Sequence, residues 1–228
     1  MLCWSPRCVA GANNQLDLYC ERLGPEFWAE PLNAISNGGF IIAAWLAWRL
    51  AASLPGRTPW TTHLLIGLLA TIGVGSFLFH TLAVTWAMWA DVIPIFLYQL
   101  LFLVLYVGRV ARLRPLACAV WVVLFFAASW GFAALPVQWL NGSLSYGSAF
   151  VFVAGMAAYH WRSGQREPLG LGLATLLFAL SLTCRSLDMQ VCTWLSTGTH
   201  PLWHLLNAGV LYLSTRALVL NEERRVPG

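Results

Sequence analysis

The sequence predicts an all-α polytopic membrane protein, a bundle of seven transmembrane helices with an extracytoplasmic amino terminus and a cytoplasmic carboxyl terminus. Two observations predict this class. The 228 residues are 59% apolar and only 10% charged, whereas a soluble domain carries about 25% charged residues. Crossing a bilayer takes roughly 20 apolar residues per helix, and seven segments of the chain meet that requirement. An ordinary soluble globule is therefore excluded.

Each expected span is a run of mostly Leu, Ala, Val, Phe and Trp without an internal ion pair. Short turns rich in Pro, Gly and Arg separate the runs, at 55–59, 112–115, 141–142 and 164–168. The expected spans are 32–54, 60–82, 86–107, 115–135, 144–161, 169–187 and 201–220. Because no linker or repeat interrupts them, we expect one integral-membrane domain over 1–228. It has an extracytoplasmic segment at 1–29, too polar for a signal peptide, and a short cytoplasmic tail at 221–228.

The distribution of arginine predicts the orientation. All 13 basic residues are Arg, and short cytoplasmic loops carry an excess of positive charge. Arg49, Arg57, Arg109, Arg112, Arg114, Arg162, Arg166, Arg216, Arg224 and Arg225 lie on one face of the expected topology, against Arg7, Arg22 and Arg185 on the other. The odd-numbered loops are therefore expected in the cytoplasm. Basic residues confined to short loops argue against a nucleic-acid partner, no protein partner is inferred, and the absence of Lys favours a bacterial inner membrane.

Ionisable residues within the expected spans gather near one membrane face. Such residues are costly in a bilayer and are candidates for function by default. His80 ends the second span, Asp91 lies one turn into the third, His200 and His204 open the seventh, and Glu30 with Asn33, Ser36 and Asn37 opens the first. Because consecutive spans alternate in direction, these positions are all expected in one extracytoplasmic layer.

The residue types in this layer suit a catalytic zinc ion. His200 and His204 are four residues apart, which places both imidazoles on one helical face, and His80 supplies a third nitrogen. Three protein ligands with an open fourth position are typical of catalytic zinc, which lowers the pKa of bound water to about 7. Asp91 would serve as general base and then as acid toward the leaving amine. Ser76, four residues before His80, would hydrogen-bond the water or the developing oxyanion.

Blander interpretations compete with this one. An H-x-x-x-H pair alone also suits interhelical hydrogen bonding, and only the company of His80 and Asp91 favours a metal. His63 and His160 lack such companions, so we interpret both as structural. An intramembrane serine protease using Ser76 is disfavoured because the Gly-x-Ser-x-Gly setting is missing. A transporter is disfavoured because no broken span or internal symmetry is visible.

Two of the cysteines expected outside the membrane lie at opposite ends of the chain. Cys20 precedes the first span and Cys192 lies between the last two, so an oxidising compartment would permit them to pair. Cys118 and Cys184 lie within apolar spans and are interpreted as inert small hydrophobes.

At these residues the sequence resembles the alkaline ceramidase family, within a wider group of membrane hydrolases that includes the adiponectin receptors. The matching segments are Cys20-Glu21, Glu30 to Asn37, Gly75 to Leu82, Asp91 to Pro94, Arg185 to Asp188 followed by Cys192, and His200 to His204. The resemblance implies a seven-helix amidase that cleaves ceramide, or a related lipid amide drawn from the bilayer, into a sphingoid base and a fatty acid.

The resemblance also assigns roles. It implies zinc ligands at His80, His200 and His204, a catalytic acid/base at Asp91 and a serine contacting the water or oxyanion at Ser76. It further implies a disulfide between Cys20 and Cys192. The alternative is a lipid-sensing receptor with a structural zinc, like the adiponectin receptors, which would have no need of Asp91 and Ser76.

The resemblance implies a calcium ion as a second cofactor, although the motif departs from the family pattern. The family binds calcium with an Asp-Trp-Cys-Glu-x-Asn stretch and the Glu that opens the first span. Here Asp17 sits one residue early and Leu23 takes the Asn position. Glu21 and Glu30, with Asp17 and a carbonyl near Tyr19, are the expected ligands, and calcium needs six to eight oxygens. The competing interpretation is that these acids are simply solvated.

Overall fold

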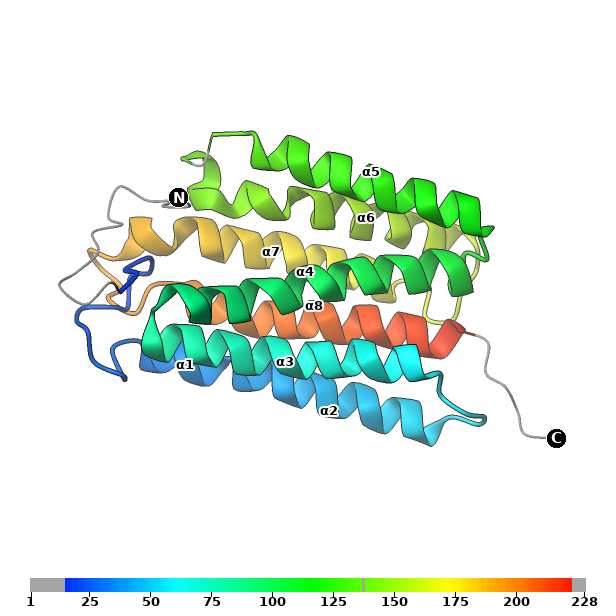
Figure 1. Cartoon of the computed structure of the whole chain (residues 1–228), viewed down its shortest axis with the longest axis horizontal. Coiled ribbons are helices and arrows are strands. Elements are labelled where there is room, and N and C mark those ends of the chain that lie inside the picture. Colours follow the sequence, from blue (N-terminus) through cyan, green and yellow to red (C-terminus); the bar gives the residue numbers. More distant parts are fainter. Residues whose placement is uncertain (1–14, 137, 223–228) are drawn as a thin grey trace.

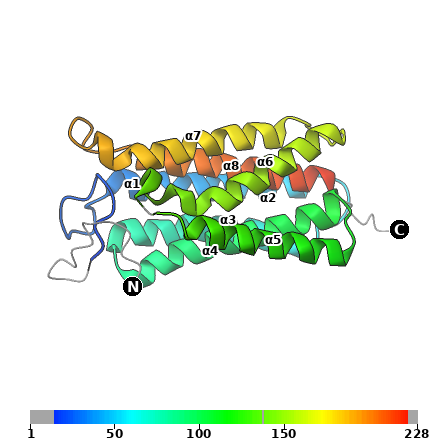
Figure 2. The ribbon, with the colours of Figure 1, turned by 90° about the horizontal axis from the view of Figure 1, so that it is seen from above.

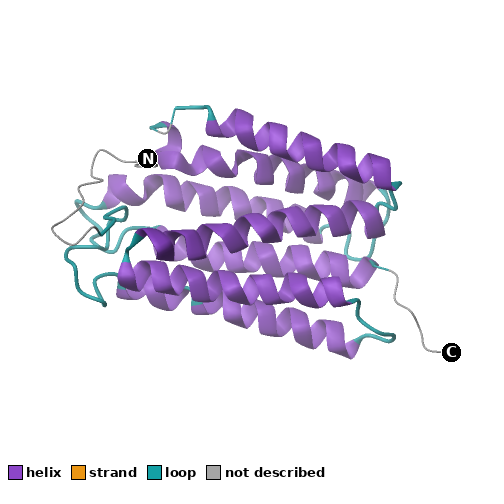
Figure 3. Ribbon diagram, in the orientation of Figure 1, coloured by secondary structure: helices purple, strands orange, loops and turns teal. Residues whose placement is uncertain are grey.

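The computed structural model describes residues 15–136 and 138–222, which form a bundle of helices with no strand in either range (Figures 1 and 3). The all-α class is therefore confirmed. The helices are α1 Pro31–Ser36, α2 Gly38–Ser53, α3 Trp60–Leu82, α4 Thr85–Leu105, α5 Pro115–Ala133, α6 Gly147–Arg162, α7 Gly170–Val191 and α8 His200–Asn221. A π-helical turn, Tyr106–Val110, follows α4, and a 3-10 segment, Trp139–Tyr146, precedes α6. Of the residues used to predict orientation, Arg7, Arg224 and Arg225 lie outside the described ranges.

Each expected span contains a long helix, but two boundaries were wrong. The first span is divided at Asn37, between α1 and α2. In the fifth expected span, helix α6 begins at Gly147, three residues later than expected. Residues 144–146 belong instead to the 3-10 segment that precedes α6. The turn expected at 141–142 is present, because Leu140, Asn141 and Gly142 have positive φ angles of 52°, 51° and 75°.

Four described helices are long and apolar enough to cross a membrane: α3, α4 with its π-helical turn, α5 and α7. Helices α2 and α6 each have 16 residues, fewer than a full crossing needs. Helix α8 has 22 residues but interrupts its apolar sequence with two histidines, Asn207 and Arg216. Length and composition alone therefore mark four spans rather than the expected seven.

Many large apolar side chains face outward, as expected of a bundle surrounded by lipid. Helix α5 illustrates this, because Phe125 is its only buried residue and Trp130 is 81% exposed. Helix α5 lies at the edge of the bundle beside α6 (Figures 1 and 2). The inner helices α2, α3, α4 and α8 pack against one another around the core.

The long helices run up and down the bundle, so their ends gather in two layers (Figure 1). One layer holds the carboxyl ends of α3 and α7, the amino ends of α1, α4 and α8, and the segment 15–30. In the opposite layer, the side chain of Glu222 is buried between helix ends. It accepts hydrogen bonds from Thr62 Oγ1 at 2.8 Å and from Arg109 Nη1 at 2.9 Å. These bonds hold α3 and the end of α4 against the end of α8.

Candidate metal centre and active site

The layer that contains the segment 15–30 brings together three histidines from two helices. His80 comes from the last turn of α3, and His200 and His204 come from the first two turns of α8. All three are buried, and one nitrogen from each lies within 4.8 Å of the others. The ring centroids are separated by 4.5 to 5.2 Å. This is the three-histidine set that the sequence predicts.

Hydrogen bonds fix the orientation of two of these rings. His80 Nδ1 lies 2.6 Å from Oε2 of Glu30, and this carboxylate can only accept, so Nδ1 carries the proton. Ser36 donates its single hydroxyl proton to the carbonyl of Asn33 at 2.9 Å, so it accepts from His204 Nδ1 at 2.7 Å. With Nδ1 protonated in both rings, each Nε2 keeps a free lone pair. This is the second-shell arrangement expected of metal-binding histidines.

The unpaired nitrogens show that the residues fit a metal ion. His80 Nε2 and His200 Nδ1 are fully buried and have no hydrogen-bond partner among the described residues. A buried polar atom without a partner costs free energy. A cation bound between the three clustered imidazoles would satisfy both atoms, and three nitrogen donors favour zinc.

Asp91 and Ser76 lie next to the histidine cluster, where α3 and α4 approach most closely. Asp91 is in the second turn of α4, and its carboxylate lies against the Ser76 hydroxyl. A side chain at Gly75 would collide with the backbone carbonyl of Ala90. The absence of a side chain at Gly75 therefore allows α3 to bring Ser76 up to Asp91.

Asp91 opens onto a cavity of about 310 Å³, a size at the lower end of small-molecule sites. Its lining includes apolar residues of α4 and seven polar residues: Tyr19, Asp91, Gln99, Asn141, Ser145, Tyr146 and Arg185. The Tyr19 ring also stacks on His200, with centroids 3.8 Å apart. Tyr19 therefore contacts both the cavity and the metal centre, and its burial raises the pKa of its hydroxyl.

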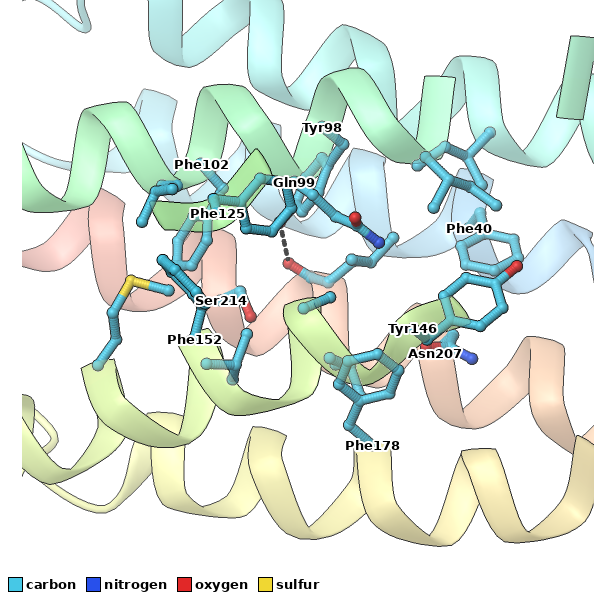
Figure 4. A pocket seen from close by; sticks show the side chains of 18 of the residues that line it. Phe40, Tyr98, Gln99, Phe102, Phe125, Tyr146, Phe152, Phe178, Asn207 and Ser214 are labelled. Carbon is cyan, nitrogen blue, oxygen red and sulfur yellow. Dashed lines mark hydrogen bonds between the residues drawn. The ribbon is translucent and has the colours of Figure 1, made fainter. Parts of the chain in front are cut away.

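A second cavity of about 50 Å³ continues into the apolar core, as Figure 4 shows. Phe102, Phe125, Phe152 and Phe178 surround it, with Asn207 and Ser214 of α8 on one side. Ile95, Gln99 and Tyr146 line both cavities. The two cavities therefore adjoin, one polar and next to Asp91, the other apolar and within the bundle.

Asp188 holds the amino end of α8 in place, and a disulfide lies close to it in sequence. Oδ1 of Asp188 accepts the backbone N–H groups of Thr199 at 2.8 Å and His200 at 2.9 Å, and Oδ2 accepts that of Cys20 at 3.0 Å. A negative charge at a helix amino end is favourable. Cys20 and Cys192 are joined by a disulfide, with Cα atoms 5.5 Å apart. Asp188 therefore joins the segment before α1 to the start of the helix that carries two of the histidines, and the disulfide joins the same segment to the end of α7.

The expected calcium ligands do not form one oxygen cluster. Both oxygens of Glu21 accept backbone N–H groups, those of Leu32 and Asn33, each at 2.8 Å. Glu30 is occupied by other donors, and Asp17 is exposed. Burial alone would raise the pKa of Glu30, but hydrogen bonds from His80 and Asn33 and the charge of Arg22 outweigh it and hold this pKa below its usual value. The carboxylates predicted for calcium accept hydrogen bonds as a helix cap and as the partner of a histidine, and calcium binding stays a prediction.

The remaining histidines lie away from this centre. His160 is buried and bonds to the hydroxyl of Tyr106 and the carbonyl of Arg166 at the opposite end of the bundle. His63 is exposed. Cys118 and Cys184 are unpaired and half-buried. Sequence reasoning missed the supporting roles of Ser36 and Asp188. The only available signals were the place of Ser36 in the polar group that opens the first span, and the presence of an acid before α8.

Comparison with known protein families gives one result that covers almost the whole chain. The model of the ceramidase family matches residues 19–223, from the segment before α1 to the end of α8. A search of curated proteins found no match. The family match confirms the resemblance noted on the sequence. The chain belongs to the ceramidase family, and is therefore an amide hydrolase that acts on carbon–nitrogen bonds.

Proposed function

We propose that the protein is a zinc-dependent ceramidase that cleaves the amide bond of ceramide, or of a related lipid amide, to a sphingoid base and a fatty acid. One observation carries this proposal. Three buried imidazoles from α3 and α8 lie together, two of them, His80 and His200, have a buried nitrogen without a hydrogen-bond partner among the described residues, and a carboxylate and a cavity lie beside them. His80, His200 and His204 would hold the zinc. When bound, it would supply Lewis acidity toward the amide carbonyl and activate water.

Asp91 would move the proton that the reaction requires. As general base it takes a proton from the attacking water while the new carbon–oxygen bond forms. It then gives that proton to the amide nitrogen, so that the carbon–nitrogen bond breaks and the sphingoid amine leaves. Ser76 would donate its hydroxyl proton in a hydrogen bond to the oxygen on which negative charge develops. Its position against Asp91 supports this role.

The shape of the site supports a lipid substrate. The polar cavity beside Asp91 suits the amide and hydroxyl groups, and the adjoining apolar cavity suits the first part of an alkyl chain. At about 50 Å³ the inner cavity is small, so a long chain would need to displace neighbouring side chains or extend along α4 toward the bilayer. Val92, Ile93 and Leu97 on α4 are exposed and apolar, which offers such a path.

We also propose that all seven long helices span the membrane as one domain, with the amino terminus and the metal centre on the extracytoplasmic side of a bacterial inner membrane. Arg109, Arg112, Arg162 and Arg166 all lie at the end of the bundle opposite the metal centre. The positive-inside rule then places that end in the cytoplasm. A disulfide near the metal centre suits an oxidising compartment.

Purified protein assayed on long-chain ceramide in micelles tests the proposal. Asp91→Asn should keep the metal and slow turnover by about a hundredfold to ten-thousandfold, the usual contribution of a general acid/base. Glu167→Gln removes the same charge at the far end of the bundle and should retain full activity. Metal retained with wild-type turnover in Asp91→Asn would overturn the assigned role. Bound zinc without any hydrolysis in the wild type would favour the lipid-sensing receptor.

A further inference from the structure

The segment before α1 contains a buried cation of its own. The side chain of Arg22 is only 3% exposed. Its Nε donates to Oε1 of Glu30 at 2.5 Å, Nη1 to the carbonyl of Gly24 at 3.1 Å, and Nη2 to the carbonyl of His80 at 2.9 Å. A charge removed from water is stable only when it is paired and hydrogen-bonded. Arg22 meets both conditions.

The partners of Arg22 are the kinds of oxygen that calcium prefers. Calcium takes six to eight oxygens from carboxylates and carbonyls, and Arg22 binds one carboxylate and two carbonyls. Oε2 of Glu30 accepts from His80 and from Asn33 Nδ2, while Glu21 caps α1. With these carboxylates occupied, a dication would have to displace several hydrogen bonds and lie beside a guanidinium of the same sign.

We infer that the guanidinium of Arg22 takes the place of the calcium ion that the family resemblance implies, and that it positions His80. It fastens the segment 15–30 to the end of α3 through the His80 carbonyl. It also holds Glu30, whose other oxygen accepts the Nδ1 proton of His80. Arg22 is thus a positioning residue, acting on a zinc ligand through its backbone and its side chain. The positioning role rests on the proposed zinc site, whereas the replacement of calcium can be tested without measuring hydrolysis.

Calcium titration of the wild-type protein tests whether Arg22 takes the place of a calcium ion. The protein is freed of calcium by dialysis and titrated with CaCl2, with equilibrium dialysis and Tm as readouts and zinc content measured in every sample. We expect no stoichiometric calcium and no rise in Tm. A ligand at a hundredfold excess over its Kd would raise the Tm by several degrees. One calcium per chain, or such a rise, would overturn the replacement, whatever the outcome for zinc or hydrolysis.

The variant Arg22→Ala tests the positioning role, with Arg49→Ala as the control. Arg49 lies over the Trp45 ring on α2, away from the metal centre. Arg22→Ala should lower the Tm and weaken zinc binding by about tenfold, the lower end for a supporting contact. Millimolar guanidinium should partly restore both, whereas urea, a neutral analogue of the same shape, should not. Wild-type zinc affinity in Arg22→Ala, or no restoration by guanidinium, would overturn the role of the cation.

Discussion

The hydrogen bond between Ser36 and His204 leads to a prediction about metal affinity. In Ser36→Ala, the Nδ1 proton of His204 loses its partner 2.7 Å away, and the ring is free to change tautomer. Removing such a supporting contact weakens metal binding by about 10-fold to 100-fold. This corresponds to about 1.4 to 2.7 kcal/mol, at 1.36 kcal/mol per tenfold change. The zinc affinity of Ser36→Ala should fall within this range.

Competition with a chromophoric chelator measures this affinity, and Tm measured in parallel reports the fold. Ser53→Ala is the matched control, because Ser53 also donates to a backbone carbonyl in the same part of the sequence but is distant from the histidines. Ser53→Ala should bind zinc like the wild type. If Ser36→Ala binds zinc as tightly as the wild type does, the assignment of Ser36 as a support for a metal ligand is wrong.

Three further predictions concern the substrate, the helix contact and pH. Shortening the acyl chain of ceramide by four carbons should lower kcat/KM more than a hundredfold, since each buried methylene contributes about 0.8 kcal/mol; a flat profile would contradict a buried chain. Gly75→Ala should push α3 away from α4, costing about 1 to 3 kcal/mol of stability and much of the activity. Gly67→Ala, on the same helix with open space around it, should lower neither stability nor activity. Equal Tm values for Gly75→Ala and Gly67→Ala would refute the close contact between α3 and α4. The hydrogen bond from Arg216 lowers the pKa of Glu167, so this pair stabilises the fold above the usual glutamate pKa of about 4.3 and loses that effect as pH falls through the lowered value. The Tm difference between wild type and Arg216→Gln should therefore vanish in strong acid, and a constant difference would argue against the ion pair.

The helices and the histidine cluster could be predicted because both depend on regular periodicity. Hydropathy marks apolar helices whatever their packing, and the spacing of His200 and His204 places them on one face of any α-helix. Alternating span directions then bring His80 to the same layer. The positions of the helices and of this layer do not depend on how each helix is rotated about its axis.

The supporting contacts could not be predicted because they do depend on how each helix is rotated about its axis. Ser36 meets His204 across 168 positions of sequence, a contact that depends on the rotation of two helices and on the division at Asn37. Glu21 and Glu30 were expected to share a calcium ion. Sequence alone does not show that Arg22 folds inward rather than toward water. In the structure Arg22 donates to Glu30 and to the carbonyls of Gly24 and His80, and Glu30 also lies within hydrogen-bond distance of His80 Nδ1. Hydropathy likewise did not show that α6 begins at Gly147, because residues 144–146 belong to a 3-10 segment and not to the α-helix.

Elemental analysis of the purified protein tests the central claim, that His80, His200 and His204 together hold one zinc ion. The wild type should contain one zinc per chain. His204→Ala should contain far less while keeping its helical circular dichroism. His63→Ala, which removes an exposed histidine from α3, should retain the full amount. Full zinc occupancy in His204→Ala, or no zinc in a wild-type protein that hydrolyses ceramide, would contradict the account.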